Sequence, residues 1–258
     1  MGEIRALGAY GTKVDGKGTT AFWLNDRHVI DAGNLLTGMH DKVADIEGIW
    51  LTHSHLDHLL DIAFIMSGYF TDRKRPLRIM GLPETLDAVK EHFLNDKIWP
   101  DFSEIKMADS ELMSVEYFPI EIGKIYDIGN GMHIEPIPAD HIVPCCGYKV
   151  SDAESAVLIS SDTYSLDAMI EKIENDETVR SIVVECSFPS KMEMIAQVSK
   201  HLTPKLLFDQ LEALNNRNLK LYINHIKPTY ETQIRAEIEA MKGSWDCIIL
   251  QDGDEISY

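Results

Sequence analysis

The sequence predicts an α/β fold, arranged as a four-layer αββα sandwich in which two β-sheets lie face to face between outer layers of helices. The first observation is that strand-like segments open the chain and return after a helical middle part. The second is that helices alternate with strands toward the C-terminus, as they do where helices cover a sheet. The third is that histidine and aspartate residues directly follow several strands, and sites in such folds sit on loops that the sheets hold.

The length of 258 residues is enough for one large α/β domain with a substantial core. No internal repeat or long linker divides the chain, so we predict a single domain over residues 1–258, with a helical and loop insertion around residues 67–110. The first residues lack the basic-then-apolar pattern of a signal peptide. The longest near-apolar stretch, residues 59–66, contains Asp61 and is too short to span a membrane. We therefore expect a cytoplasmic protein with no membrane partner.

In the first half of the chain, short β-rich segments punctuated by glycine predict strands, and apolar residues at helical spacing predict helices. The predicted strands are residues 3–10, 19–25, 28–32 and 48–52. The predicted helices are residues 59–70 and 83–94, and the second begins at Pro83. Residues 95–110, which include Trp99, are predicted to be irregular.

In the second half, a block of strands comes first and helix-strand alternation follows. The predicted strands are residues 115–120, 124–128, 132–138, 147–150, 156–160, 181–185, 220–224 and 247–251. The predicted helices are residues 166–175, 191–200, 204–215 and 230–241. Two blocks of strands interleaved with helices in this way indicate two sheets with helices outside.

The chain is strongly acidic, which restricts its partners. It has 24 Lys and Arg residues against 42 Asp and Glu residues, for a formal net charge of −18. A field of that sign repels polyanions, so a long nucleic acid is not expected as a partner. A small anion can still bind where divalent metal ions supply positive charge locally.

One short segment carries ligand-type side chains at a spacing that indicates a metal site. His53, His55, Asp57 and His58 follow the predicted strand 48–52 and precede a helix. In an extended loop His53 and His55 point to the same side, and the other two turn toward a neighbouring position at the helix start. Imidazole and carboxylate suit zinc, manganese or iron. The alternative is a polar helix entrance capped by Asp57.

One such cluster cannot complete two metal sites, and the sequence supplies three further ligand-type residues. His141, Asp162 and His225 each lie just after a predicted strand. Taken alone, each would more often be a capping or solvated polar residue. Taken together and in this order, they favour ligands of a two-metal centre.

The order of these residues resembles the metallo-β-lactamase superfamily. By this resemblance, His53, His55 and His141 hold the first metal ion. Asp57, His58 and His225 hold the second, and Asp162 bridges the two. Asp31 matches the early strand-end aspartate of the superfamily, which supports the site without being a ligand. The sequence following His58 is Leu59-Leu60-Asp61, whereas lactamase-like and thioesterase-like members often continue with two glycines.

Several other segments resemble the class II cyclic-nucleotide phosphodiesterases of that superfamily. These segments are Gly81-Leu82-Pro83-Glu84-Thr85, Asn95-Asp96-Lys97-Ile98-Trp99-Pro100, Glu185-Cys186-Ser187-Phe188, His201-Leu202-Thr203-Pro204 and Asn224-His225-Ile226-Lys227-Pro228. The resemblance implies hydrolysis of 3′,5′-cyclic AMP, with cyclic GMP as a second candidate, to the 5′-monophosphate. The attacking group would be a hydroxide that bridges the metal ions.

Glu185 and His201 also resemble a pair in the phosphodiesterase branch that includes the tRNA 3′-end nucleases, where a Glu and a His act together near the scissile phosphate. We therefore predict that both are catalytic, together with Asp57 and Asp162, which orient the nucleophile. The alternative is that Glu185 is a strand-end charge and His201 a helix-end cation. His28, His40, His92 and His133 have no such context and are predicted to be surface or satisfied polar residues.

The predicted activity is thus a binuclear metallohydrolase, a cyclic-nucleotide phosphodiesterase. The alternatives are a nuclease acting on tRNA 3′ ends, a lactonase or thioesterase of the same fold, and a non-catalytic metal-binding protein. The expected cofactors are two divalent metal ions, zinc as the first choice and manganese or iron as alternatives. The expected partner is a small cyclic nucleotide, and the family resemblance suggests a homodimer.

Overall fold

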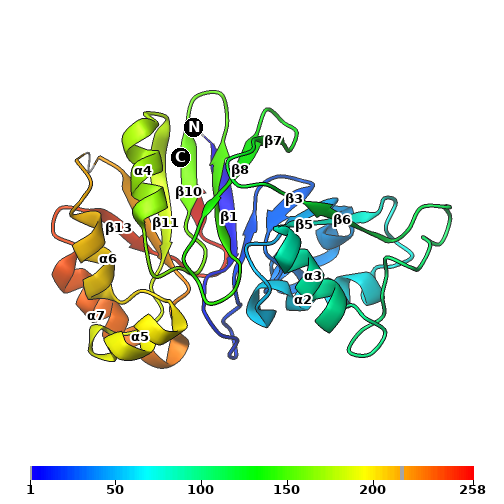
Figure 1. Ribbon diagram of the computed structural model, residues 1–258, viewed down its shortest axis with the longest axis horizontal. Coiled ribbons are helices and arrows are strands. Elements are labelled where there is room, and N and C mark those ends of the chain that lie inside the picture. The colour runs from blue at the N-terminus through cyan, green and yellow to red at the C-terminus, as the bar shows by residue number, and fades with distance from the viewer. Residues whose placement is uncertain (1, 216–217) are drawn as a thin grey trace.

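Two seven-stranded β-sheets lie face to face in the computed structural model of the chain, which describes residues 2–215 and 218–258 (Figure 1). Helices α1 to α3 flank the first sheet, and helices α4 to α7 flank the second (Figure 1). The predicted αββα sandwich is therefore confirmed. Met1 and residues 216–217, which the predicted domain includes, lie outside the described ranges.

The first sheet is built mainly from the N-terminal half of the chain. Its strands, in spatial order, are β14 (Glu255–Ser257), β1 (Glu3–Gly8), β2 (Ala21–Trp23), β3 (His28–Ile30), β4 (Gly48–Trp50), β5 (Leu77–Gly81) and β6 (Val115–Pro119). Its helices are α1 (Leu35–Met39), the 3-10 helix η1 (His40–Asp45), α2 (Leu56–Gly68) and α3 (Pro83–His92). Strands β3, β4, β5 and β6 run parallel to one another.

The second sheet is built from the C-terminal half. Its strands, in spatial order, are β13 (Asp246–Ile249), β12 (Lys220–Asn224), β11 (Val179–Glu185), β10 (Ala156–Ile159), β9 (Cys146–Ser151), β8 (His133–Pro138) and β7 (Tyr126–Asp127). Its helices are α4 (Asp167–Asn175), η2 (Ser190–Met192), α5 (Glu193–Ser199), α6 (Pro204–Leu211), η3 (Pro228–Tyr230) and α7 (Glu231–Met241).

Alternation of apolar side chains along the strands produces three stacked cores. In β10, Val157 and Ile159 face the other sheet, whereas Leu158 faces the helices. In β4, Trp50 enters the core between the sheets and Ile49 enters the core beneath α1 to α3. Successive side chains of a strand point to opposite faces, so a strand that is apolar at every position contributes to two cores at once.

Some predicted boundaries differ from the structure. The predicted helix 191–200 is a 3-10 turn followed by α5. Helix α5 ends before Lys200, and Lys200 itself has a left-handed backbone conformation (φ 52°). The predicted helix 204–215 ends at Leu211. Short elements were missed altogether, namely α1, η1 and β14. Each of these is only three to six residues long, too short to show a clear apolar period.

The region predicted as an insertion, residues 67–110, contains two integral elements of the first sheet layer. Strand β5 lies between β4 and β6 with parallel pairing on both sides, and Leu77 and Ile79 are fully buried. Helix α3 covers the same sheet through Leu86 and Val89. Residues 93–114 have no helix or strand, apart from isolated bridges at Leu94 and Lys106, and they project from the first layer (Figure 1).

Parallel pairing aligns the strand ends that carry the predicted ligands. Strands β3 and β4 are parallel in the first sheet, and β10, β11 and β12 are parallel in the second. The C-terminal ends of these strands therefore meet at one edge of the sandwich. The loops that follow them bring together residues that are far apart in the sequence.

Candidate metal centre

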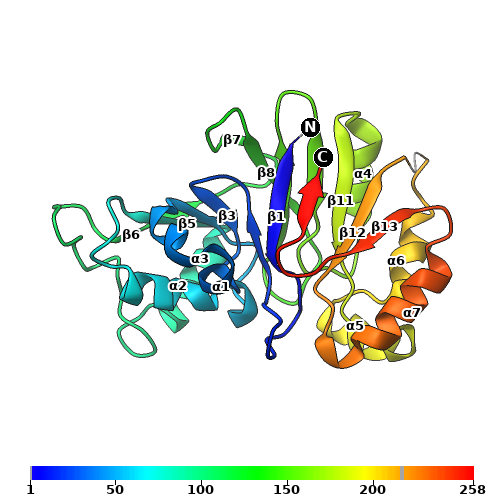
Figure 2. The same ribbon diagram turned by 180° about the vertical axis from the view of Figure 1, so that it is seen from behind.

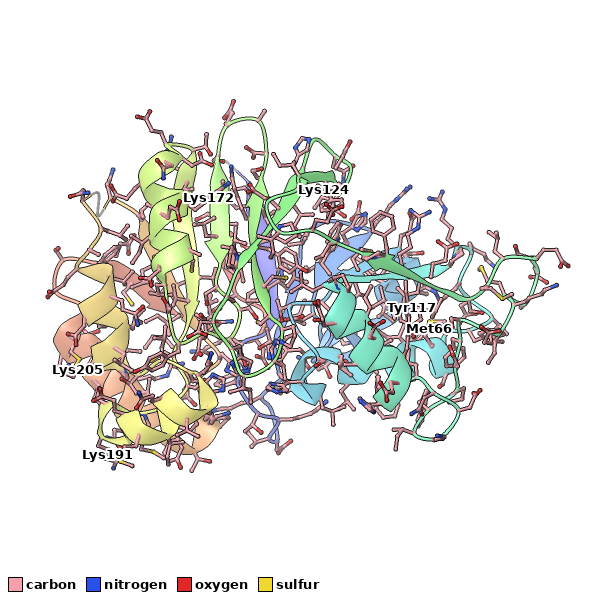
Figure 3. The ribbon with its side chains drawn as sticks, in the orientation of Figure 1. Met66, Tyr117, Lys124, Lys172, Lys191 and Lys205 are labelled. Atoms are coloured by element: carbon pink, nitrogen blue, oxygen red, sulfur yellow. The ribbon has the colours of Figure 1, made fainter. Side chains whose placement is uncertain are left out.

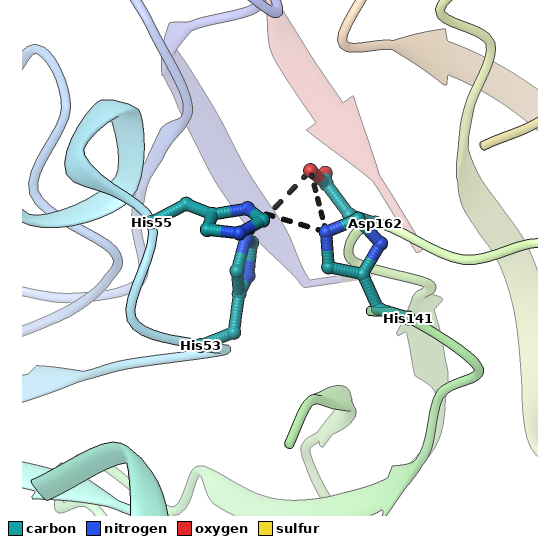
Figure 4. A group of neighbouring side chains, drawn as sticks. All are labelled: His53, His55, His141 and Asp162. Carbon is teal, nitrogen blue, oxygen red and sulfur yellow. Dashed lines mark hydrogen bonds and ion pairs between the residues drawn. The ribbon is translucent and has the colours of Figure 1, made fainter. Parts of the chain in front are cut away.

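All seven residues predicted as ligands lie together at this edge. One group consists of His53, His55, His141 and Asp162, and its potential ligand atoms lie within 4.8 Å of one another (Figure 4). A second group of the same compactness consists of Asp57, His58 and His225. They come from the loop after β4, the first turn of α2 and the loops after β8, β10 and β12.

The first group is arranged around the Asp162 carboxylate. His55 Nδ1 lies 3.2 Å from His141 Nε2. Asp162 Oδ2 lies 3.7 Å from His53 Nε2 and 4.0 Å from His141 Nε2. Three nitrogens and a carboxylate oxygen at such spacing surround a volume suited to one tetrahedral cation.

The second group adjoins the first through the same carboxylate. His58 Nε2 and His225 Nε2 are 3.3 Å apart, and Asp57 Oδ2 is 3.5 Å from His225 Nε2. Asp162 Oδ1 lies 3.3 Å from His225 Nε2, while its Oδ2 lies 3.5 Å from His58 Nε2. Asp162 therefore stands between the two groups.

Hydrogen bonds on the outer side of the imidazole rings fix which nitrogen faces the centre. The Thr52 hydroxyl donates to Asp31 at 2.9 Å and accepts from His53 Nδ1 at 3.0 Å. His58 Nδ1 donates to Asp31 at 2.8 Å. Each Nδ1 thus carries a proton, and in the neutral ring this leaves the Nε2 lone pair directed inward as a ligand requires.

Two further rings, those of His141 and His225, are held in the same way. His141 Nδ1 donates to the Lys200 carbonyl at 3.1 Å. His225 Nδ1 lies 2.9 Å from the Ser187 hydroxyl, which itself donates to Glu185 at 2.9 Å. The support predicted for Asp31 is therefore present, whereas the roles of Thr52, Ser187 and Lys200 were missed. Position next to a ligand was the only sequence signal for Thr52.

The backbone at this edge is held in an uncommon conformation. Asp31, Ser161 and His225 have φ values of 58°, 59° and 58°, in the left-handed region that non-glycine residues rarely adopt. All three are buried. Asp31 and His225 directly follow strands β3 and β12, and Ser161 lies one residue further from the end of β10. Strain of this kind persists only where the surroundings enforce it, and it concentrates at functional sites.

Close backbone approach also requires glycine here. A Cβ on Gly33 would lie 2.2 Å from the Asp57 carbonyl oxygen. A Cβ on Gly11 would lie 2.6 Å from the His225 carbonyl oxygen. Any larger residue would displace one of these ligand-type side chains through its own backbone.

The electrostatics of the centre favour a cation. Although burial disfavours its charged form, His225 and His58 hold the pKa of Asp162 well below its ordinary range. Burial opposes protonation of His58 as well, but Asp162 and Asp31 raise the pKa of that ring well above its usual value. Burial lowers the pKa of His53 well below the ordinary value, which keeps its ring neutral.

An independent observation indicates that these donor atoms suit divalent metal ions. His53 Nε2 is buried and has no hydrogen-bond partner, although buried polar atoms are nearly always paired. The atom faces the Asp162 carboxylate at the centre of the first group. A cation held there would satisfy it, and imidazole with carboxylate is the donor set of zinc, manganese and iron.

Glu185 and His201 form a buried pair beside the two groups. His201 Nδ1 donates to Glu185 Oε1 at 2.7 Å, and it lies 4.0 Å from Asp162 Oδ2. Glu185 is fully buried at the end of β11, and His201 follows Lys200 at the end of α5. Burial lowers the pKa of His201, but the Glu185 carboxylate outweighs this and raises that pKa above its ordinary value.

The other histidines stay outside the centre. His28 is half-buried and accepts a hydrogen bond from the Trp50 indole at 3.2 Å. His40 and His92 are exposed, and His133 is half-buried at the start of β8. None of the four belongs to a group of ligand-type residues in the described part of the chain.

Comparison with known proteins finds a similarity to class-II cyclic-nucleotide phosphodiesterases. Residues 18–136 match the family model described as cAMP phosphodiesterases class-II. The 3′,5′-cyclic-nucleotide phosphodiesterase 1 of Saccharomyces cerevisiae is 26% identical over 234 residues, which is 77% of this chain and 61% of that protein. The chain thus spans about three fifths of the length of the first curated relatives it matches.

Two solved structures share the fold over nearly the whole chain. The unliganded yeast PDE1 superposes with a TM-score of 0.79 at 19% identity, covering 99% of both chains. The metallo-β-lactamase fold protein YhfI from Bacillus subtilis superposes with a TM-score of 0.74 at 17% identity, again covering 99% of both chains. These comparisons confirm the resemblance predicted from the sequence.

Proposed function

We propose that this chain, a relative of the class-II cyclic-nucleotide phosphodiesterases with the metallo-β-lactamase fold, hydrolyses 3′,5′-cyclic nucleotides to 5′-monophosphates. The observation that carries the proposal is the pairing of His201 with Glu185 beside two adjoining groups of candidate metal ligands. A protonated side chain near such a centre favours phosphodiester hydrolysis, because it can hold an anionic phosphoryl oxygen and protonate the alkoxide leaving group.

We assign two divalent cations to the two groups, zinc being the first choice. His53, His55 and His141 would hold one, and Asp57, His58 and His225 would hold the other, with Asp162 between them. When bound, the two cations lower the pKa of water and neutralise phosphate charge.

The protein's own residues then orient and protonate the reacting groups. Asp57 and Asp162 accept hydrogen bonds from the attacking water and align it with phosphorus. His201, kept protonated by Glu185, holds a phosphoryl oxygen and passes its proton to the departing 3′ oxygen of the ribose. Glu185 is a positioning residue because it acts through His201.

The charge of −18 supports a small substrate rather than a long nucleic acid. No helix within residues 2–215 and 218–258 is long and apolar enough to cross a bilayer. A single domain over residues 1–258, a homodimer and a cytoplasmic location are parts of the same proposal.

The test is turnover of 3′,5′-cyclic AMP and cyclic GMP by protein loaded with zinc or manganese, with the product identified. Chelator-sensitive release of the 5′-monophosphate is the expected result. A precursor tRNA and a panel of lactones and thioesters run in parallel. Cleavage of one of these, without turnover of either cyclic nucleotide, would replace the proposal with the corresponding alternative.

A further inference from the structure

A second charged cavity lies at the edge of the first sheet opposite the candidate metal centre. It has a volume of about 490 Å³ and is bordered by Trp23 at the end of β2 and by the segments that lead into β4 and β5. His28 pairs with Gly48, and Gly48 pairs with Arg78, so this edge holds the N-terminal ends of β3, β4 and β5. We call it the edge cavity.

The edge cavity is cationic in a strongly acidic protein. Five of its lining residues are basic: Arg27, Lys42, Arg73, Lys74 and Arg75. Three are acidic: Asp26, Asp45 and Glu47. The difference, 5 − 3, is an excess of two positive charges, whereas the chain as a whole carries −18. Such a local reversal of charge marks a site that selects anions.

Arg73 is the buried element of this site. Only 6% of the residue is exposed, and its guanidinium donates to the backbone carbonyls of Ala44 and Ile46. Its Nε atom is buried without a hydrogen-bond partner, and no carboxylate in the described ranges forms an ion pair with it. Burial lowers the pKa of Arg73 to about 10, so the group is still charged at neutral pH.

A buried cation without a counter-charge is costly, and protein interiors normally pair it. Glu47 and Asp45 act on the charge of Arg73 from a distance, but neither forms an ion pair with it, and the Glu47 carboxylate lies 3.2 Å from Arg27 and 2.6 Å from Arg75. Lys42 lies over the Trp23 ring at 5.1 Å, which leaves its ammonium at the cavity rim. All five basic residues line the same cavity, which an anion of several oxygens could enter.

We propose that the edge cavity binds the phosphoryl group of a small phosphorylated molecule, at a site separate from the candidate metal centre. Guanidinium and ammonium donors from three segments match the several acceptor oxygens of a phosphate. Trp23, whose ring lies beneath the Lys42 ammonium, borders the same cavity. This inference does not depend on the proposed phosphodiesterase activity.

The experiment follows the indole N–H resonance of Trp23 in the metal-loaded protein while inorganic phosphate is added. That N–H donates to the Asn25 carbonyl next to the cavity, so it reports binding there and not at the metal centre. Assignment comes from the Trp23→Phe variant. A saturable shift below about 10 mM phosphate is expected, and sodium chloride at the same ionic strength should not reproduce it.

Two variants with opposite expected effects sharpen the test. Lys74→Gln with Arg75→Gln removes two exposed cations and should weaken phosphate binding about tenfold or more. Glu47→Gln removes the carboxylate that occupies Arg27 and Arg75, and should tighten binding. Lys205→Gln, an exposed site on α6 at the far end of the molecule, is the matched control and should change nothing (Figure 3).

A second titration uses adenosine 5′-monophosphate. Tighter binding than inorganic phosphate would identify a nucleotide as the ligand, and equal binding would show that the phosphoryl group alone is recognised. The proposal is overturned by the absence of a saturable shift with both ligands, by an equal shift with sodium chloride, or by unchanged affinity in the double variant.

Discussion

Replacing Asp31 by asparagine tests how the protein holds its second group of ligands. Asp31 is fully buried and accepts hydrogen bonds from the Thr52 amide at 2.8 Å, the Thr52 hydroxyl at 2.9 Å and His58 Nδ1 at 2.8 Å. Asparagine keeps the shape and tolerates the φ of 58°, so the change removes mainly the charge.

The magnitude follows from the contact with His58. A hydrogen bond to a charged group contributes about 1.5–3 kcal/mol. Without the hydrogen bond from its Nδ1 to Asp31, the His58 ring is less basic and less well oriented. The affinity of the protein for the second metal ion should therefore fall about 10–100-fold. The first ion should lose much less, because Asp31 reaches His53 only through Thr52.

The assay is competition with a chelator, resolved into two binding steps, together with a thermal melt of the metal-free protein. Asp41→Asn, at an exposed position, is the control. Asp31→Ala should add about 1–2 kcal/mol of destabilisation, because alanine does not favour the left-handed conformation. Unchanged affinity for both metal ions in Asp31→Asn would refute the argument that Asp31 orients His58.

Three further substitutions test the rest of the site. Glu185→Gln should lower kcat/KM for a cyclic nucleotide about 10²–10⁴-fold. Glu185 raises the pKa of His201, so His201 normally stays protonated to higher pH. In the Glu185→Gln variant the alkaline limb of the pH–rate profile should therefore move to lower pH. An alkaline limb at the same pH as in the unmodified protein would contradict this role of Glu185. Ser187→Ala should reduce metal content about tenfold by freeing His225, and should lower the melting temperature of the metal-free protein slightly, because Glu185 loses a buried hydrogen bond. Burial lowers the pKa of His141 from 6.5 to about 4. Between these two pH values the unfolded chain binds more protons than the folded chain. The metal-free protein should therefore lose stability as the pH falls from 6.5 to 4. His141→Asn should show a weaker pH dependence of the melting temperature over that interval.

The sequence was most informative where ligand-type residues follow apolar strands. His141, Asp162 and His225 could be selected because parallel strands end at a common edge, and the structure places them together there. The residues that orient them could not be selected in this way. Ser187 and Lys200 act through a hydroxyl and a backbone carbonyl, which any loop can supply, so only the folded arrangement reveals them.

The same limit applies to the edge cavity. Its basic residues come from three separate segments, and only the segment Arg73-Lys74-Arg75 forms a run of like charge in the sequence. Arg73 looks like an ordinary surface arginine in the sequence. Its burial beneath the carbonyls of Ala44 and Ile46 follows only from the packing of η1 against the segment before β5.

The pairing of β14 with β1 has a consequence for folding order. Glu3 lies opposite Ser257, and β14 sits beside β1 in the back view (Figure 2). The outermost strand of the first sheet is thus made after every strand of the second sheet. During synthesis, residues 3–8 therefore have no β14 partner on that side until the end of the chain is made. Because pairing across so long a stretch of chain is slow to form, we expect the closure of this contact to be a late step of folding.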